Sequence, residues 1–102
     1  MEELEMIIFK IISAAGEAKS CYMEAITAAR EGDFETAVSL LKKGDEVYKE
    51  GHEVHFDLVQ KEASGNGVTP GLLLIHAEDQ MMSAELTRAM ADEFILLYKE
   101  RG

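Results

Sequence analysis

The chain has 102 residues, 47% of them hydrophobic, with 20 acidic and 10 basic side chains and a formal net charge of −10. This charge argues against binding nucleic acid or an anionic membrane, and suits a partner with a basic surface. The single cysteine, Cys21, excludes a disulfide within the chain. Together with the acidic start and the lack of a long apolar run, it predicts a reduced, cytoplasmic protein with one domain, residues 1–102.

The first predicted helix covers residues 2–31. Apolar side chains recur there at spacings of three and four, as an amphipathic helix requires. They are Leu4, Ile8, Ile11, Ala15, Ala18, Tyr22, Ala25 and Ala29. Gly16 costs this helix about 1 kcal/mol relative to alanine, which a close approach by another helix would explain. At the end of the helix, Gly32 suits a left-handed C-terminal cap and Asp33 suits the N-cap of the next helix.

The second predicted helix covers residues 34–63. Its expected buried side carries Ala37, Leu40, Leu41, Val47, Val54 and Leu58. Gly44 and Gly51 interrupt that side and weaken the helix by roughly 2 kcal/mol unless something compensates. They mark either a close approach of another backbone or a soft spot. The helix ends before Ser64-Gly65-Asn66-Gly67, the clearest break in the chain.

The third predicted helix covers residues 70–100, with Thr69 as its N-cap and Pro70 at its first position. At about 100° per residue, one stripe collects apolar and polar side chains together. Its members are Leu72, His76, Asp79, Ser83, Leu86, Met90, Phe94 and Leu97. The charged residues Glu78, Glu85, Arg88, Asp92 and Lys99 gather on the other side.

These elements predict an all-α fold, an antiparallel three-helix bundle. Each helix has about 30 residues and is roughly 45 Å long, which is unusual for a single chain of this size. The wide apolar surfaces indicate that the bundle packs against copies of itself. Five of the six methionines, Met6, Met23, Met81, Met82 and Met90, are interpreted as packing residues, and Cys21 as a core or boundary residue.

His76 and Asp79 are the candidate functional residues, because ionisable groups on an apolar stripe need a partner or a task. A neutral imidazole is a nucleophile at cellular pH, and His76 lies near the positive end of its helix. The alternative is a histidine packed in an interface. Copies of Asp79 meeting at a symmetry axis would need a cation such as Mg²⁺, unless the carboxylate points into water.

The other ionisable candidates carry weaker signals. His52 and His55 lie three residues apart beside Glu53, a spacing that allows a metal pair but occurs by chance on helix surfaces. We interpret both histidines as surface or edge-of-core residues. Glu78 lies outside the stripe and is expected at the surface.

The run Leu73-Leu74-Ile75-His76-Ala77-Glu78-Asp79-Gln80, with Met82 after it, resembles the signature of the lactose/cellobiose-type enzyme IIA component of the bacterial sugar phosphotransferase system. The likeness covers nearly the whole chain. It includes Gly16-Glu17-Ala18-Lys19, Gly32-Asp33-Phe34 and Gln60-Lys61-Glu62-Ala63. The chain departs from the pattern at Gly44 and Gly51, where alanine is expected, and at Met81, where leucine is expected.

The resemblance implies a homotrimer of three-helix subunits. It implies that His76 takes a phosphoryl group from the histidine-containing phosphocarrier protein and passes it to a cysteine of the IIB component. The IIC permease then delivers a disaccharide of the lactose, cellobiose or chitobiose type for phosphorylation. It places Asp79 at the trimer axis with a divalent cation, and Gln80 beside the site. The competing hypothesis is a non-catalytic helical bundle that only binds or regulates partners, with His76 packed in an interface.

Overall fold

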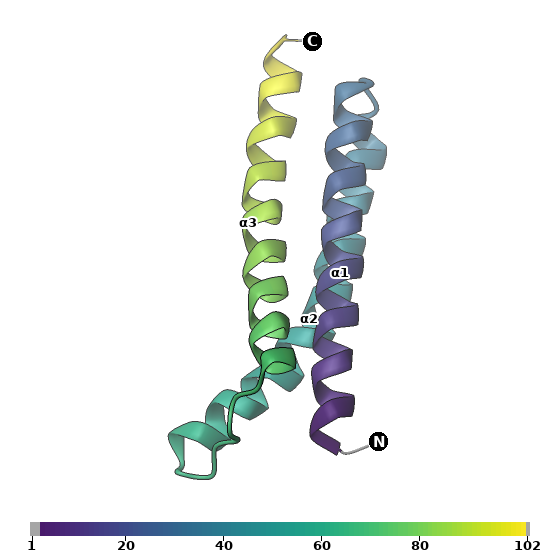
Figure 1. The fold of residues 1–102 in the computed structure, drawn as a ribbon. Coiled ribbons are helices and arrows are strands. Elements are labelled where there is room, and N and C mark those ends of the chain that lie inside the picture. The colour runs from purple at the N-terminus through teal and green to yellow at the C-terminus, as the bar shows by residue number, and fades with distance from the viewer. Residues whose placement is uncertain (1–2, 102) are drawn as a thin grey trace.

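The structure is a computed structural model that describes residues 3–101 and contains three long helices (Figure 1). They are α1 (Glu3–Arg30), α2 (Phe34–Ala63) and α3 (Leu72–Arg101). Helices α1 and α3 run in the same direction and α2 runs against them, which confirms the all-α, three-helix prediction. The described residues measure 52 × 24 × 20 Å. None of these helices is apolar enough over a sufficient length to cross a membrane.

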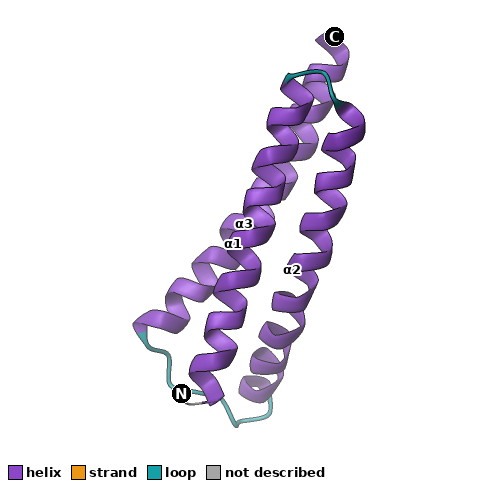
Figure 2. Ribbon diagram, turned by 90° about the vertical axis from the view of Figure 1, so that its right-hand side faces the viewer, coloured by secondary structure: helices purple, strands orange, loops and turns teal. Residues whose placement is uncertain are grey.

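Helix α1 is the common partner of the other two, since α2 and α3 both pack along it and contact each other little (Figure 2). One core cluster lies around the N-terminal half of α1, and its buried members are Ile8, Ile11, Ala15, Leu58, Ala77, Met81 and Ala84. The other cluster lies around the C-terminal half, with Ala18, Tyr22, Ala25, Ala28, Ala29, Ala37, Leu41, Ala91 and Ile95. The many alanines let the helix axes approach closely.

The link between α1 and α2 is the one expected from the sequence. Gly32 has a φ of +84°, and the amides of Gly32 and Asp33 donate to the carbonyls of Ala29 and Ala28 at 3.0 and 2.9 Å. This pair of bonds is a Schellman cap. Asp33 then begins α2, because its carboxylate accepts a hydrogen bond from the backbone N–H of Thr36 at 3.1 Å. That bonding with Thr36 lowers the pKa of Asp33.

The start of α3 differs from the prediction. The helix begins at Leu72, and the first backbone bond runs from the N–H of Ile75 to the carbonyl of Gly71 at 3.1 Å. Thr69 is therefore not the N-cap, and Pro70 is not the first helical residue. Gly71 takes the cap position, because its carbonyl accepts the first backbone hydrogen bond of the helix.

The three glycines inside helices have different surroundings. A Cβ at Gly44 would lie 2.5 Å from the ring of Tyr22, and one at Gly51 would lie 2.8 Å from Cβ of Ala14. Both glycines therefore allow α2 to approach α1 closely, which decides between the two readings of the sequence. The prediction for Gly16 is wrong within this chain, because no atom outside its own helix turn lies within 4 Å of its Cβ position.

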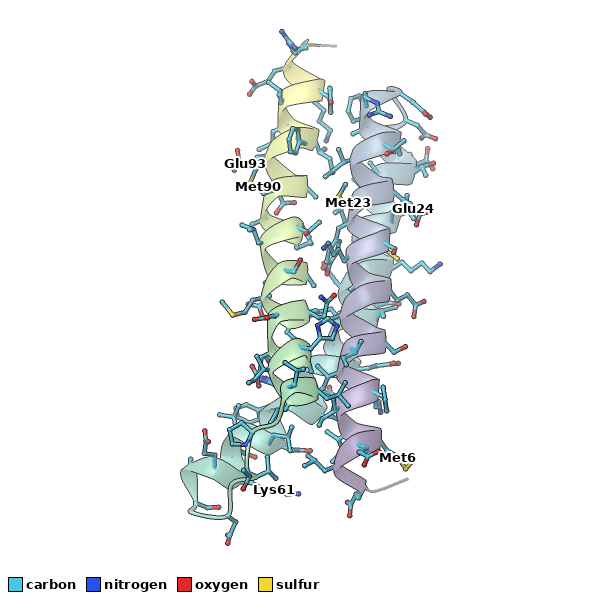
Figure 3. The ribbon with its side chains drawn as sticks, viewed as in Figure 1. Met6, Met23, Glu24, Lys61, Met90 and Glu93 are labelled. Carbon is cyan, nitrogen blue, oxygen red and sulfur yellow. The ribbon has the colours of Figure 1, made fainter. Side chains whose placement is uncertain are left out.

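The buried face of α3 is also not the stripe chosen from the sequence. Helix α3 turns Ala77, Met81, Ala84, Ala91 and Ile95 toward α1. Small alanines on this face made it look weakly apolar, whereas the larger side chains lie outside. Among the methionines, Met81 is buried, while Met6, Met23, Met82 and Met90 are exposed in the single chain. Figure 3 shows Met90 and Glu93 projecting from α3 away from α1.

Candidate functional site

His76 lies in the second turn of α3, with an exposed side chain. Its neighbour Ala77 is fully buried against the core, so His76 is directed about 100° away from that contact. In the described part of the chain, the histidine that forms a side-chain hydrogen bond is His55, not His76. The imidazole of His76 is thus accessible to another molecule, and in its neutral form one ring nitrogen has a free lone pair that can act as a nucleophile.

Asp79 is one turn further along α3 and is also exposed. It lies within a face of α3 made of large apolar side chains that are exposed in the single chain. The face consists of Leu72, Ile75, Met82, Leu86, Met90 and Leu97. Leu72, Met82 and Leu86 are 84%, 68% and 65% exposed. Such a continuous apolar face on one helix is characteristic of a surface that another protein covers.

A single chain does not offer a metal site at Asp79. Among residues 3–101, no three His, Cys, Asp or Glu side chains come close enough to hold an ion. Mg²⁺ takes oxygen ligands from carboxylates and water. Asp79 supplies one carboxylate, so the residues of one chain fit a divalent cation only if other copies bring their own Asp79 to the same place.

His55 and Glu78 form a bridge between α2 and α3 that the sequence analysis missed. The distance from Nε2 of His55 to Oε1 of Glu78 is 2.7 Å, and the two side chains are 19% and 46% exposed. Glu78 is therefore not a plain surface residue. His52, one turn before His55, is exposed and stacks on Tyr48 at a centroid distance of 5.9 Å.

Two more polar bridges join the same helices. Tyr48 donates its hydroxyl hydrogen to Glu85, and Arg88 donates to both carboxylate oxygens of Asp45 at 2.8 and 3.2 Å. The spacings mirror each other. The bridge positions on α2 (45, 48 and 55) differ by three and then by seven, and those on α3 (78, 85 and 88) differ by seven and then by three. This antiparallel match of spacings is a signal that the sequence does contain.

The Asp45 bridge extends to the core through Tyr22. The Tyr22 hydroxyl donates to Asp45 at 2.7 Å, and the Arg88 guanidinium lies 5.7 Å from the centre of the Tyr22 ring. Burial acts to raise the pKa of Asp45, but the hydrogen bonds from Arg88 and Tyr22 outweigh it and the pKa is lowered. Hydrogen bonding to Asp45 is the main cause that raises the pKa of Arg88. This network ties all three helices together.

Two further features lie near these elements. A hollow of about 170 Å³ lies between the end of α2, the connecting segment and the start of α3; its lining includes Leu58, Val68, Pro70 and Glu78 but not His76. Cys21 is buried as expected, and burial raises the pKa of its thiol. A thiol that stays protonated is a poor nucleophile. The exposed imidazoles are those of His76 and His52, and His52 is the one that stacks on a neighbouring ring, that of Tyr48.

The comparisons with known proteins agree with one another. The model of the family "PTS system, Lactose/Cellobiose specific IIA subunit" matches residues 6–99. The lichenan-specific phosphotransferase enzyme IIA component of Bacillus subtilis (strain 168) is 41% identical over 99 residues, covering 97% of this chain and 90% of that protein.

Two solved structures are similar over almost the whole chain. The crystal structure of the cellobiose-specific PTS enzyme IIA from Bacillus anthracis has a TM-score of 0.94 at 38% identity, covering 98% of this chain and 92% of that one. The solution structures of the IIA(chitobiose)–HPr complex of the Escherichia coli phosphotransferase system give 0.83 at 29% identity, covering 98% and 97%. Since the family model and these relatives span nearly all of the sequence, the chain belongs to the lactose/cellobiose-specific IIA subunit family of the sugar phosphotransferase system.

Proposed function

We propose that His76 is the phosphoryl acceptor of this IIA subunit. The observation that carries the proposal is the exposed imidazole of His76, free of hydrogen bonds within the described residues, on a turn whose other side is anchored in the core. An acceptor of this kind must be open to two partners in turn. The buried thiol of Cys21 and the bonded imidazole of His55 lack that access.

The donor in this proposal is HPr, the histidine-containing phosphocarrier protein. The similar IIA(chitobiose) forms a complex with HPr. A nitrogen of His76 attacks phosphorus as the bond from phosphorus to the donor histidine breaks, so the phosphoryl group moves from nitrogen to nitrogen. A cysteine thiolate of the IIB component then attacks the same phosphorus and releases neutral His76. The IIC permease uses the phosphoryl group indirectly, during uptake of a disaccharide.

Such a transfer depends mainly on alignment and electrostatics, since the phosphoryl group needs an in-line path between two nucleophiles. The net charge of −10 favours encounter with a basic partner surface. This reaction places the protein in the cytoplasm, where phosphoenolpyruvate supplies the phosphoryl groups.

We further propose that the exposed face of α3 assembles three chains into a homotrimer. Its leucines and methionines form one apolar strip along a helix, which suits association about an axis parallel to α3. Asp79 lies within this strip, so three carboxylates approach one another near the axis. Mutual repulsion is relieved there by a divalent cation, for which Mg²⁺ with its oxygen ligands is the natural candidate.

Phosphate labelling tests the acceptor. The chain is incubated with radiolabelled phosphoenolpyruvate, enzyme I and HPr, and the expected product carries one acid-labile phosphate. His76→Gln abolishes the labelling without changing the helical circular dichroism. His52→Gln is the matched control, because His52 is also exposed but lies on α2. Labelling that persists in His76→Gln, or no acid-labile phosphate in the wild type, contradicts the proposal and favours a bundle that only binds partners.

A further inference from the structure

We propose that His55 is a positioning residue for phosphoryl transfer at His76, and that it acts through Glu78. This inference rests on the proposed function of His76. Nε2 of His55 lies 2.7 Å from Oε1 of Glu78, and the imidazole is mostly buried, with 19% of its side chain exposed. Because an ionised carboxylate only accepts hydrogen bonds, the proton of this contact lies on Nε2 of His55.

The first turns of α3 have few other supports. Leu72 is almost fully exposed, and Gly71 provides only its carbonyl to the start of the helix. Leu74 and Ala77 pack into the core cluster around α1. Glu78 adds the polar contact of this region to α2. The turn that carries His76 is thus held by apolar packing on α1 and on Leu58 of α2, and by the polar bond to His55.

Two directions of support are needed to fix the rotation of a helix about its own axis. Ala77 and Glu78 are adjacent, so their side chains leave α3 about 100° apart. Packing of Ala77 alone allows α3 to roll on α1, whereas a second anchor toward α2 prevents the roll. A roll of about 10° moves a group about 6 Å from the helix axis by about 1 Å. A misplacement of that size slows group transfer by up to about 100-fold.

Among the described residues that line the hollow beside Glu78, none can replace His55 in this role. The hollow beside Glu78 is lined by apolar side chains and by Glu62, which is a second carboxylate and cannot donate to the first. The bridges from Tyr48 to Glu85 and from Asp45 to Arg88 lie farther along the seam. They hold the middle of α3 rather than the turn with His76.

The experiment measures the steady-state transfer of phosphate from phosphorylated HPr to the full-length chain, with the chain as the varied substrate. His55→Leu keeps the volume but removes the donor, and we expect kcat to fall about tenfold with KM unchanged. His55→Gln restores most of the rate, since its amide N–H donates to Glu78. Tyr48→Phe, which removes a bridge between the same helices farther from His76, stays at the wild-type rate.

Glu78→Ala tests the same bridge from its other end. It lowers kcat to the same degree as His55→Leu, and the double variant is no slower than either single one, since both remove one contact. In the ¹⁵N–¹H spectrum, the ring signals of His76 shift in His55→Leu and return to their wild-type positions in His55→Gln. A general loss of stability would not give this pattern of rescue.

Three results overturn the positioning role: wild-type kcat in His55→Leu, a rate in His55→Gln as low as in His55→Leu, or an equal loss in Tyr48→Phe. The proposed function fails separately. If the His76→Gln chain is still phosphorylated, His76 is not the acceptor and the proposed function fails. If the His76→Gln chain is inactive and the His55→Leu chain is fully active, only the positioning role of His55 is contradicted.

Discussion

The backbone of Gly44 lies against the ring of Tyr22, so closely that a Cβ at Gly44 would stand 2.5 Å from Cε1 and 2.9 Å from Cδ1 of the tyrosine. Tyr22 is 2% exposed, and its hydroxyl is held by Asp45 at 2.7 Å. The ring is therefore fixed at both ends and has no space to move aside. The absence of a side chain at Gly44 is what lets the tyrosine reach across to α2.

Gly44→Ala is accordingly expected to destabilise the protein. The gain of about 1 kcal/mol in helix propensity is outweighed by overpacking, which costs about 1 to 3 kcal/mol. Urea unfolding followed by circular dichroism measures the difference. Gly16→Ala is the control, because nothing lies within 4 Å of that Cβ position, and it stabilises the chain. A gain of stability in both variants would contradict the close contact.

The close contact between Gly51 and Ala14 can be tested from both sides. An alanine at position 51 would bring two Cβ atoms to 2.8 Å. We expect Gly51→Ala to destabilise the protein, because an overpacking cost of about 1 to 3 kcal/mol outweighs the gain of about 1 kcal/mol in helix propensity. Ala14→Gly removes the opposing Cβ and recovers part of this loss in the double variant, despite its own cost in helix propensity. Thermal and urea unfolding of the two single variants and the double variant give the coupling. Strict additivity would show that the two positions do not meet.

Asp45 is expected to contribute to stability in a pH-dependent way. Its pKa in the folded protein lies below the reference value of 3.8. In the window below that value the unfolded state binds more protons, so the contribution is present above about pH 4 and is lost as the pH falls through the folded-state pKa. Urea midpoints between pH 2 and 6 should therefore fall less steeply with acid for Asp45→Asn than for the wild type. Asp57→Asn, at an exposed position, is the control and should follow the wild type. If the urea midpoints of Asp45→Asn and the wild type fall equally steeply with acid, the prediction is contradicted.

Asp79 makes a prediction about assembly. If three carboxylates meet near an axis, their mutual repulsion costs stability, and Asp79→Leu keeps or raises trimer stability while removing any dependence on divalent ions. Sedimentation velocity with Mg²⁺ and with a chelator compares the variant with the wild type. A variant that dissociates to monomers would show that Asp79 stabilises the assembly instead of destabilising it.

Much of the fold could be predicted from local chemistry. Gly32 ends one helix because its backbone takes a positive φ, and Asp33 begins the next because its carboxylate caps it. The three helices lie within a few residues of their predicted bounds. Thr69 and Pro70 were misassigned because a proline two residues before a helix and one inside its first turn look alike in sequence. The glycine at position 71 took the cap instead.

The face of α3 was harder to predict because hydrophobic size and burial do not coincide. Ala77, Ala84 and Ala91 are fully buried, whereas Leu86 and Met82 are largely exposed. Close helix packing selects small residues, so a search for large apolar side chains finds the outer face first. His76 and Asp79 are polar groups on that outer face, and both are exposed in the single chain. The His55–Glu78 bridge needed the register between α2 and α3, which no single helix contains.

The central place of α1 also determines how the molecule comes apart. Helices α2 and α3 each pack on α1 and contact each other little, through polar bridges and around Leu58. We therefore expect α3 to detach while an α1–α2 hairpin remains. Amide hydrogens in the middle of α1 should then exchange only on global unfolding, and those at the start of α3 should exchange first. The helix that carries His76, the proposed phosphoryl acceptor, is thus the one that we expect to open most readily, and association of further chains over its outer face would keep it closed.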